Sequence, residues 1–151
     1  ELVGSLLAGM TASIEPPDAQ IEPHIDTINE WMAGDDLTII HDRVRNWQGE
    51  DKWLVKAQDG FAHGSPLAAT WIFRQLNQTR EASLEAVFES ELVLGCNIMR
   101  HPEFAEGVRA LLVDKDRTPA WAYPDLASVP AEVVDTFFTA PVNMPALGLP
   151  E

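Results

Sequence analysis

The sequence predicts an all-helical fold, and three observations support that prediction. Between residues 21 and 138, apolar residues recur at intervals of three and four, the period of one face of a helix. Serine or aspartate precedes several of these segments, where its side chain can cap a helix. No segment alternates convincingly between apolar and polar residues, as a half-buried strand does. We therefore expect helices and no sheet, and we find no internal repeat.

The N-terminal part of the chain predicts two helices joined by a linker. Residues 2–10 are expected to be the end of a helix, followed by the proline-containing stretch TASIEPPDAQIEP. A second helix is expected from about residue 21 to residue 32, where Ile25 and Ile28 stand at helical spacing. Gly34 is expected to end it, because glycine readily adopts the backbone conformation found after a helix.

Two further helices are expected before residue 60. Asp35 or Asp36 can cap a helix over residues 37–47, and a fourth helix is expected over residues 51–58. Gly60 and Gly64 are then expected to bracket a loop.

The second half carries the strongest helix signals. Ser65-Pro66 starts a helix whose apolar residues lie on nearly all sides, which predicts burial between two layers. Ser83 begins the longest helix, and His101-Pro102 opens the next. After a break at DKDRTP, Ser128 is expected to start a short helix.

The predicted organisation is one helical domain with two flanking segments. Residues 1–20 are expected to be the end of a preceding helix and a linker, and residues 21–138 the helical domain. Residues 139–151 are expected to be an irregular tail, because they are rich in proline. With 151 residues, 46% of them apolar, the chain is long enough to build one compact core.

Composition narrows the choice of partners. Ten basic and 24 acidic side chains give a net charge of −14, and no segment concentrates lysine and arginine. Nucleic acid is therefore not an expected partner, although a phosphate-bearing small molecule needs only two or three donors. The opening ELVGSLLAGM is too short to span a membrane, so no membrane partner is expected. A single cysteine, Cys96, fits a reducing compartment, and we expect the cytoplasm.

Most catalytic and metal-binding motifs are absent from the sequence. It contains no GxSxG, HExxH or CxxC motif and no glycine-rich phosphate loop. Four histidines, His24, His41, His63 and His101, are scattered, so no metal site is expected. The sequence HGSP at residues 63–66 permits a Ser/His pair, but we favour a helix cap at Ser65.

Glu91 lies between Leu84, Phe88 and Gly95 on the wheel of the longest helix. A carboxylate in an apolar stripe is unfavourable unless it is paired. It is interpreted either as an acid/base group with a raised pKa or as a buried partner of Arg74 or Arg100, and we favour the ion pair.

The segment FAEGVRALLVDKDRTPAW combines a glycine within a helix with an abrupt end. Gly107 predicts the close approach of another helix, because a mid-helix glycine otherwise costs about 1 kcal/mol. Arg109 is expected to pair with Glu106 or to reach another element. Lys115 and Arg117 either complement the negative end of the helix, which we favour, or contact phosphate groups.

This segment also carries a family resemblance. The run RHPEFAEGVRALLVDKDRTPAW resembles the C-terminal region of the 3-hydroxyisobutyryl-CoA hydrolase branch of the enoyl-CoA hydratase/isomerase, or crotonase, superfamily. The segments IEPHIDTINEWM and SPLAATWIFRQLNQ follow the same branch in order and spacing.

The resemblance implies that this chain is the helical C-terminal part of an α/β crotonase (spiral) fold. The backbone oxyanion hole and the catalytic carboxylates would lie in an N-terminal core preceding Glu1, so no catalytic residue is expected in this chain. That core, in the same or a second polypeptide, is an expected partner, together with an acyl-CoA substrate. A homo-oligomer, with a second copy of the chain as partner, is compatible with the resemblance. Coenzyme A would be part of the substrate, with no separate cofactor, and Lys115 and Arg117 would contact its phosphates.

The function implied is thioester hydrolysis of 3-hydroxyisobutyryl-CoA, a reaction of valine catabolism, by the complete protein, and this chain alone is expected to be inactive. One alternative is an enoyl-CoA hydratase or isomerase. Another, from a different class, is a helical interaction module without activity. If the chain is part of a larger enzyme, an apolar surface is expected, and four aromatic residues are candidates to line it: Trp71, Phe73, Phe88 and Phe104.

Overall fold

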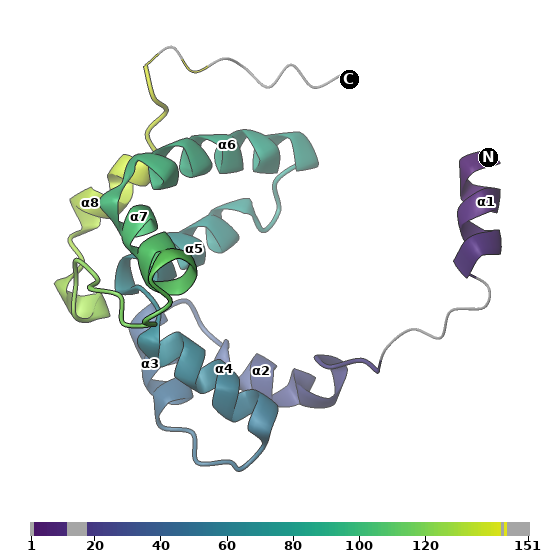
Figure 1. Ribbon diagram of the computed structural model, residues 1–151, viewed down its shortest axis with the longest axis horizontal. Helices are drawn as coiled ribbons and strands as arrows, with labels where there is room; N and C mark the ends of the chain where they lie inside the picture. The colour runs from purple at the N-terminus through teal and green to yellow at the C-terminus, as the bar shows by residue number, and fades with distance from the viewer. Residues whose placement is uncertain (1, 12–17, 143, 145–151) are drawn as a thin grey trace. The chain divides into compact units, whose positions relative to one another are not determined.

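The computed structural model of the protein describes residues 2–11, 18–142 and 144, and all regular structure in them is helical. The predicted helical class is therefore confirmed for these residues. The chain divides into two compact units, Glu1–Ala33 and Gly34–Glu151. The first contains helix α1 (Leu2–Thr11), the short 3-10 helix η1 (Glu22–His24) and helix α2 (Ile25–Trp31) (Figure 1).

The predicted segment boundaries are only partly covered by the described residues. Residues 12–17 of the expected linker, and residues 143 and 145–151 of the expected tail, lie outside them. The compact units divide after Ala33, and the domain boundary expected at residue 20 stays a prediction.

The second unit begins with a helical pair, α3 (Leu37–Arg45) and α4 (Lys52–His63). The carboxylate of Asp36 caps α3 by accepting bonds from the backbone N–H groups of Thr38 and Ile39, as the sequence predicts. Asp51 caps α4 in the same way. The expected loop from Gly60 to Gly64 is wrong, because α4 continues through Gly60 to His63.

A side chain of α4 closes the end of α3. The side-chain amide of Gln58 donates through Nε2 to the carbonyl oxygen of Val44 at 2.8 Å and to that of Arg45 at 3.1 Å. Carbonyl groups in the last turn of a helix lack intrahelical partners, so this contact satisfies them and ties the two helices together.

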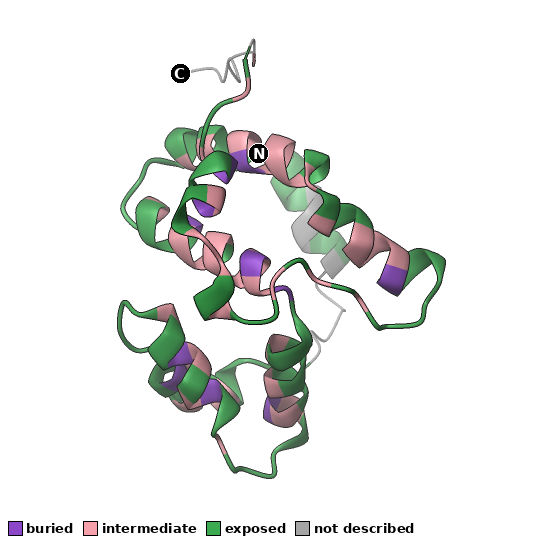
Figure 2. Cartoon of the chain, turned by 90° about the vertical axis from the view of Figure 1, so that its left-hand side faces the viewer, coloured by how far each residue is buried: buried purple, intermediate pink, exposed green. Residues whose placement is uncertain are grey.

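The main hydrophobic core lies among three helices of the second unit: α5 (Pro66–Thr79), α6 (Leu84–Arg100) and α8 (Ala131–Phe137). Four buried residues form this core: Leu67, Leu94, Val134 and Phe137. Figure 2 colours the buried residues of the chain purple. Asn97 of α6 donates to the carbonyl oxygens of Phe137 and Thr139 and thereby closes the end of α8.

Helix α5 is not buried between two layers, contrary to the prediction. Its buried face carries Leu67, whereas Ile72 and Leu76 are 44% and 62% exposed. The second layer that its sequence predicts is absent from the described residues.

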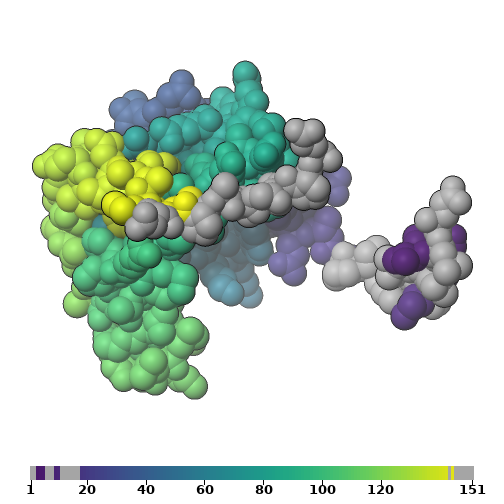
Figure 3. Space-filling model, turned by 90° about the horizontal axis from the view of Figure 1, so that it is seen from above, coloured from purple at the N-terminus to yellow at the C-terminus, as the bar shows by residue number. Residues whose placement is uncertain are grey.

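Helix α7 (Pro102–Val108) continues into η2, a π-helical turn over Arg109–Val113. This continuous segment projects from the rest of the second unit, as the green atoms of Figure 3 show. The chain then returns through an irregular segment, the 3-10 helix η3 (Leu126–Ser128) and α8. Helix α8 begins at Ala131, three residues after the serine expected to start it.

Candidate functional site

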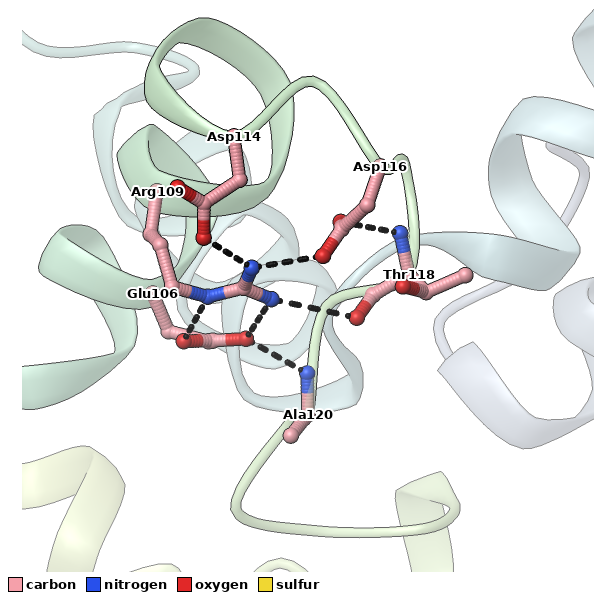
Figure 4. Close-up of polar contacts among 6 residues, drawn as sticks. All are labelled: Glu106, Arg109, Asp114, Asp116, Thr118 and Ala120. Atoms are coloured by element: carbon pink, nitrogen blue, oxygen red, sulfur yellow. Dashed lines mark hydrogen bonds and ion pairs between the residues drawn. The ribbon is translucent and has the colours of Figure 1, made fainter.

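The guanidinium group of Arg109 lies at the centre of a polar cluster at the end of the projecting segment (Figure 4). Its Nε and Nη2 atoms donate to the two carboxylate oxygens of Glu106, at 2.9 and 2.8 Å. Its Nη1 donates to Asp114 at 2.8 Å and to Asp116 at 2.6 Å. Nη2 also donates to the backbone carbonyl of Thr118 at 3.2 Å. We call these residues, Glu106, Arg109, Asp114, Asp116 and Thr118, the arginine cluster.

The arginine cluster shifts the titration of its members. The bidentate bond from Arg109, together with the backbone N–H of Ala120, lowers the pKa of Glu106 from 4.5 to about 2. The bond from Arg109 and the N–H of Thr118 also lower the pKa of Asp116. The carboxylates raise the pKa of Arg109 further above its ordinary range. All three groups therefore remain charged near neutral pH.

The expectation for Arg109 is confirmed and extended. It pairs with Glu106 one turn away, and it also reaches the segment after the helix. The sequence reading did not assign a role to Asp114 or Asp116. The alternating charges of DKDR indicate ion pairs in this segment. Which of these side chains contact Arg109 depends on the backbone conformation of the turn, which the sequence does not give.

The turn that follows η2 has an unusual backbone. Asp114 closes a π-type bond from its N–H to the carbonyl of Arg109 at 2.8 Å, and Arg117 donates its N–H to the carbonyl of Ala110 at 3.0 Å. Lys115 and Arg117 both have a φ of 57°, in the left-handed region. Such a conformation costs of order 1 kcal/mol for a residue with a side chain, so surrounding contacts must hold it.

Lys115 and Arg117 are exposed, and their side chains make no ion pair with any described residue. Arg117 lines a wide cleft of about 1030 Å³, and Lys56 of α4 lines the same cleft. The carboxylates of the arginine cluster all point to Arg109 instead (Figure 4). Lys115 and Arg117 are thus not bonded by the carboxylates of the arginine cluster.

A second glutamate, one turn before Glu106, also holds the returning chain. Glu103 accepts the backbone N–H of Ala122 at 3.1 Å, and Glu106 accepts that of Ala120 at 2.8 Å. The other oxygen of Glu103 accepts the hydroxyl of Ser65 at 2.5 Å. These bonds fix residues 118–122 against α7.

Ser65 is a helix cap, as the sequence predicts, because its hydroxyl oxygen accepts the N–H of Ala68 at 3.0 Å. It is buried, and its proton is directed to Glu103. No Ser/His hydrogen bond forms at HGSP, and His63 instead bonds the backbone carbonyl of Asp59.

The neighbour of Gly107 is a side chain rather than the expected helix. A Cβ atom at Gly107 would lie 3.3 Å from the ring of Trp121. The ring nitrogen of Trp121 donates to the backbone carbonyl of His63 at 3.0 Å, which fixes the ring. Because Gly107 has no side chain, the returning chain can pack close to the helix at this position.

An apolar cavity of about 340 Å³ lies beside this contact. Trp71 and Phe104 line it, together with Trp121 and Phe137. Of the four aromatic residues expected on an apolar surface, Phe88 and Phe104 are exposed, and Trp71 and Phe73 are half-buried.

The favoured ion pair of Glu91 is wrong. Glu91 is exposed and has no ion pair with the described residues, whereas Arg74 pairs with Asp135 of α8. The wheel placed Glu91 correctly beside Leu84 and Phe88, but that face of α6 is turned outward: Leu84 is 70% exposed. The buried Leu94 follows Glu91 by three residues, on the neighbouring stripe of the helix that packs on the core.

No group of three or more histidine, cysteine, aspartate or glutamate side chains in the described residues is arranged to hold a metal ion. None of the helices in this part of the chain has the length and apolar character needed to cross a membrane.

Solved structures define the class of fold. The chain superposes on an enoyl-CoA hydratase from Rhodobacter sphaeroides 2.4.1 with a TM-score of 0.70 and 24% identity, covering 92% of this chain and 41% of that one. It superposes on a carnitinyl-CoA dehydratase from Mycobacterium thermoresistibile with a TM-score of 0.69 and 28% identity, covering 85% of this chain and 36% of that one. The helices correspond to a helical part of the crotonase fold, as expected.

Sequence comparison assigns the family. Residues 1–138 match the model described as enoyl-CoA hydratase/isomerase, and the chain belongs to this family. It is 31% identical over 118 residues to the mitochondrial 3-hydroxyisobutyryl-CoA hydrolase of Gallus gallus, covering 78% of this chain and 30% of that protein. The enzyme of the same name from Danio rerio is 37% identical over 88 residues, covering 58% of this chain and 23% of that protein.

One similar protein carries a different kind of name. The small ribosomal subunit protein mS47 of Arabidopsis thaliana is 26% identical over 155 residues, covering 92% of this chain and 38% of that protein. The chain thus spans less than half the length of each of these relatives.

Proposed function

We propose that this chain is the helical part of an acyl-CoA thioester hydrolase that acts on 3-hydroxyisobutyryl-CoA or a close analogue. The observation that carries the proposal is the similarity to several proteins named 3-hydroxyisobutyryl-CoA hydrolase, which reaches 37% identity. The reaction adds water to the thioester carbonyl and releases 3-hydroxyisobutyrate and coenzyme A.

The catalytic groups of this reaction are proposed to lie outside this chain. Backbone N–H donors would stabilise the oxyanion, and a carboxylate would act as nucleophile or activate water. In the described residues, the strongly bonded carboxylates Glu103 and Glu106 are occupied by Ser65, Arg109 and the returning backbone. Their geometry supports a positioning role for the projecting segment rather than a chemical one.

The proposed contribution of this chain is to bind the phosphates of coenzyme A through Lys115 and Arg117. Both cations are exposed and without an ion-pair partner among the described residues, and Arg117 lines a cleft of about 1030 Å³. A cleft of that size is large enough for a cofactor-sized group. Two cations suffice to bind phosphate locally, although the chain has a net charge of −14.

The test compares two reactions of the complete protein that contains this chain. With 3-hydroxyisobutyryl-CoA, a hydrolase releases a free thiol, which a thiol-reactive dye detects. With an enoyl-CoA substrate, a hydratase consumes the conjugated double bond without releasing thiol. Thiol release with the first substrate supports the proposal. Loss of the double bond without thiol release would favour the hydratase or isomerase alternative instead.

A non-catalytic role is the second candidate, because a similar protein is named as a ribosomal subunit protein. The net charge of −14 disfavours direct binding to ribosomal RNA, since RNA contacts require local positive charge. This alternative predicts neither reaction in the complete protein. The cytoplasmic location stays a prediction, and the hydrolases compared above are named as mitochondrial.

A further inference from the structure

We propose that Arg109 is a positioning residue that holds Lys115 and Arg117 in the geometry needed to bind the phosphates of coenzyme A. The inference rests on the proposed function and assigns a role to a residue that does not itself contact the substrate. It follows from the bonding of the arginine cluster and from the backbone of the turn.

The backbone of the turn requires an external constraint. Lys115 and Arg117 are both in the left-handed region, which residues with side chains adopt only at a cost. They alternate with Asp114 and Asp116, whose carboxylates are both bound to Nη1 of Arg109. One nitrogen therefore holds the residues on both sides of Lys115, and Lys115 itself is exposed.

The same guanidinium fixes the end of the turn. Nη2 of Arg109 donates to the carbonyl of Thr118, and Asp116 accepts the N–H of Thr118 at 2.9 Å. Arg117 lies between these two anchored residues. Both cations are therefore flanked on each side by a residue that belongs to the arginine cluster.

Arg109 also binds the carboxylates around the turn, and its single positive charge offsets one of their three negative charges. Glu106, Asp114 and Asp116 all bond to the guanidinium, and the two aspartates are direct neighbours of Lys115 in the chain. Without the guanidinium, these carboxylates would be free to pair with the two cations and to repel a phosphate. A planar guanidinium with five donors can bind all three, whereas an ammonium group cannot reproduce this fork.

The test measures the Michaelis constants of the complete enzyme for two substrates. One is 3-hydroxyisobutyryl-CoA, and the other is the matching acyl-pantetheine, which lacks the nucleotide phosphates. In the wild-type enzyme, the phosphates should lower KM for the CoA substrate. Arg109→Met should raise KM for the CoA substrate relative to the pantetheine substrate about tenfold. This is the effect expected when the displaced turn loses one charge-assisted contact between a cation and a phosphate. Arg109→Lys should recover only part of that ratio, since it restores the charge and not the fork.

The matched control is Arg74→Met. Arg74 forms one ion pair with Asp135 and has a similar exposure, 33% against 35% for Arg109. It should lower thermal stability without changing the ratio of the two Michaelis constants. A general loss of packing would affect both substrates equally, so the ratio separates positioning from stability.

Three results would overturn the inference in different ways. If Arg109→Met leaves the ratio unchanged while the double variant Lys115→Gln, Arg117→Gln raises it, phosphate binding stands and the positioning role is wrong. If Arg109→Lys restores the full ratio of Michaelis constants, the positive charge at residue 109 is sufficient and the forked geometry of the guanidinium is not required. If the double variant also leaves the ratio unchanged, the proposed phosphate contacts themselves are wrong. Hydrolysis of the pantetheine substrate reports separately on the proposed reaction.

Discussion

Glu106 is the residue whose charge most strongly supports the projecting segment. Its two oxygens bind Arg109 and the N–H of Ala120, and these bonds lower its pKa to about 2. The folded pKa lies below that of an unfolded glutamate, about 4.3. The stabilising contribution is therefore complete above about pH 4.3 and is lost as the pH falls through about 2.

We predict that Glu106→Gln lowers the urea midpoint of unfolding at pH 7, because glutamine cannot provide a charged bidentate acceptor for Arg109. The difference from the wild-type protein should shrink as the pH is lowered from about 4.3 toward 2, where the wild-type carboxylate is also neutral. Unfolding curves at several pH values measure this difference. The exposed Glu89, with no bonded partner among the described residues, provides the control Glu89→Gln. A constant difference at every pH would contradict the assigned charge state.

Gly107 shows the limit of reasoning from a single residue. A glycine within a helical pattern correctly indicates a close contact, because a Cβ atom there would lie 3.3 Å from Trp121. The partner could not be identified from the pattern, because Trp121 lies in the irregular returning segment, where no periodicity indicates which way a side chain points.

At the scale of elements, the caps define where the helices of the second unit begin. Ser65 and Ser83 each accept a backbone N–H three residues ahead, at 3.0 and 3.2 Å. Only Ser65 also donates to another element, through its bond to Glu103 of α7. Comparing substitutions at the two serines therefore distinguishes the free energy of a helix cap from that of a contact between helices.

We predict that Ser83→Ala destabilises the protein by about 1 kcal/mol, the usual effect of losing a serine cap. Ser65→Ala should cost roughly 1–2 kcal/mol more, because it also removes a buried hydrogen bond to a charged group. Chemical denaturation of the two variants measures the difference. Equal losses would show that the Ser65–Glu103 bond contributes nothing to stability.

The helix starts that a side chain caps were predictable from the sequence, whereas a glycine was a poor guide to where a helix ends. Asp36, Ser65 and Ser83 cap helices as expected, because capping is a local interaction between neighbours in the chain. Gly60 was expected to end α4, yet the helix continues to His63. The cost of one glycine, about 1 kcal/mol, is small compared with the energy of packing a helix.

The candidate site was predictable only in part. The stop at DKDRTP and the Arg109–Glu106 pair follow from sequence spacing. The bonds to Asp114 and Asp116 do not, because they require the π-helical turn and the left-handed backbone at Lys115 and Arg117. Glu91 was misassigned because a helical wheel identifies a face without showing whether another element covers it.

For the whole molecule, the large exposed apolar side chains are the feature that most requires explanation. Leu111, Leu112 and Val113 of the projecting segment are 57%, 67% and 68% exposed. Clustered apolar exposure of this kind usually marks an interaction surface. Under the proposed function, the remaining part of the crotonase fold covers it.

We predict that this chain alone binds a hydrophobic fluorescent dye, whereas the complete protein binds much less. Replacing Leu111 and Leu112 with glutamate should reduce dye binding by the isolated chain, and the exposed Lys52→Glu provides a control that adds a negative charge elsewhere. Fluorescence titration and sedimentation measure dye binding and association. An isolated chain that is monomeric, unfolds cooperatively and binds no dye would support the self-contained interaction module instead.

The bonds of Arg109 have a consequence for the order of folding. The groups bonded to its side chain lie close in sequence. Glu106 is three residues before it, and Asp114, Asp116 and Thr118 are five, seven and nine residues after it. Short separations make contacts fast to form, because little chain entropy is lost in closing the loop. The turn can therefore reach its final shape soon after residues 106–118 leave the ribosome, before the distant helices α5 and α8 meet.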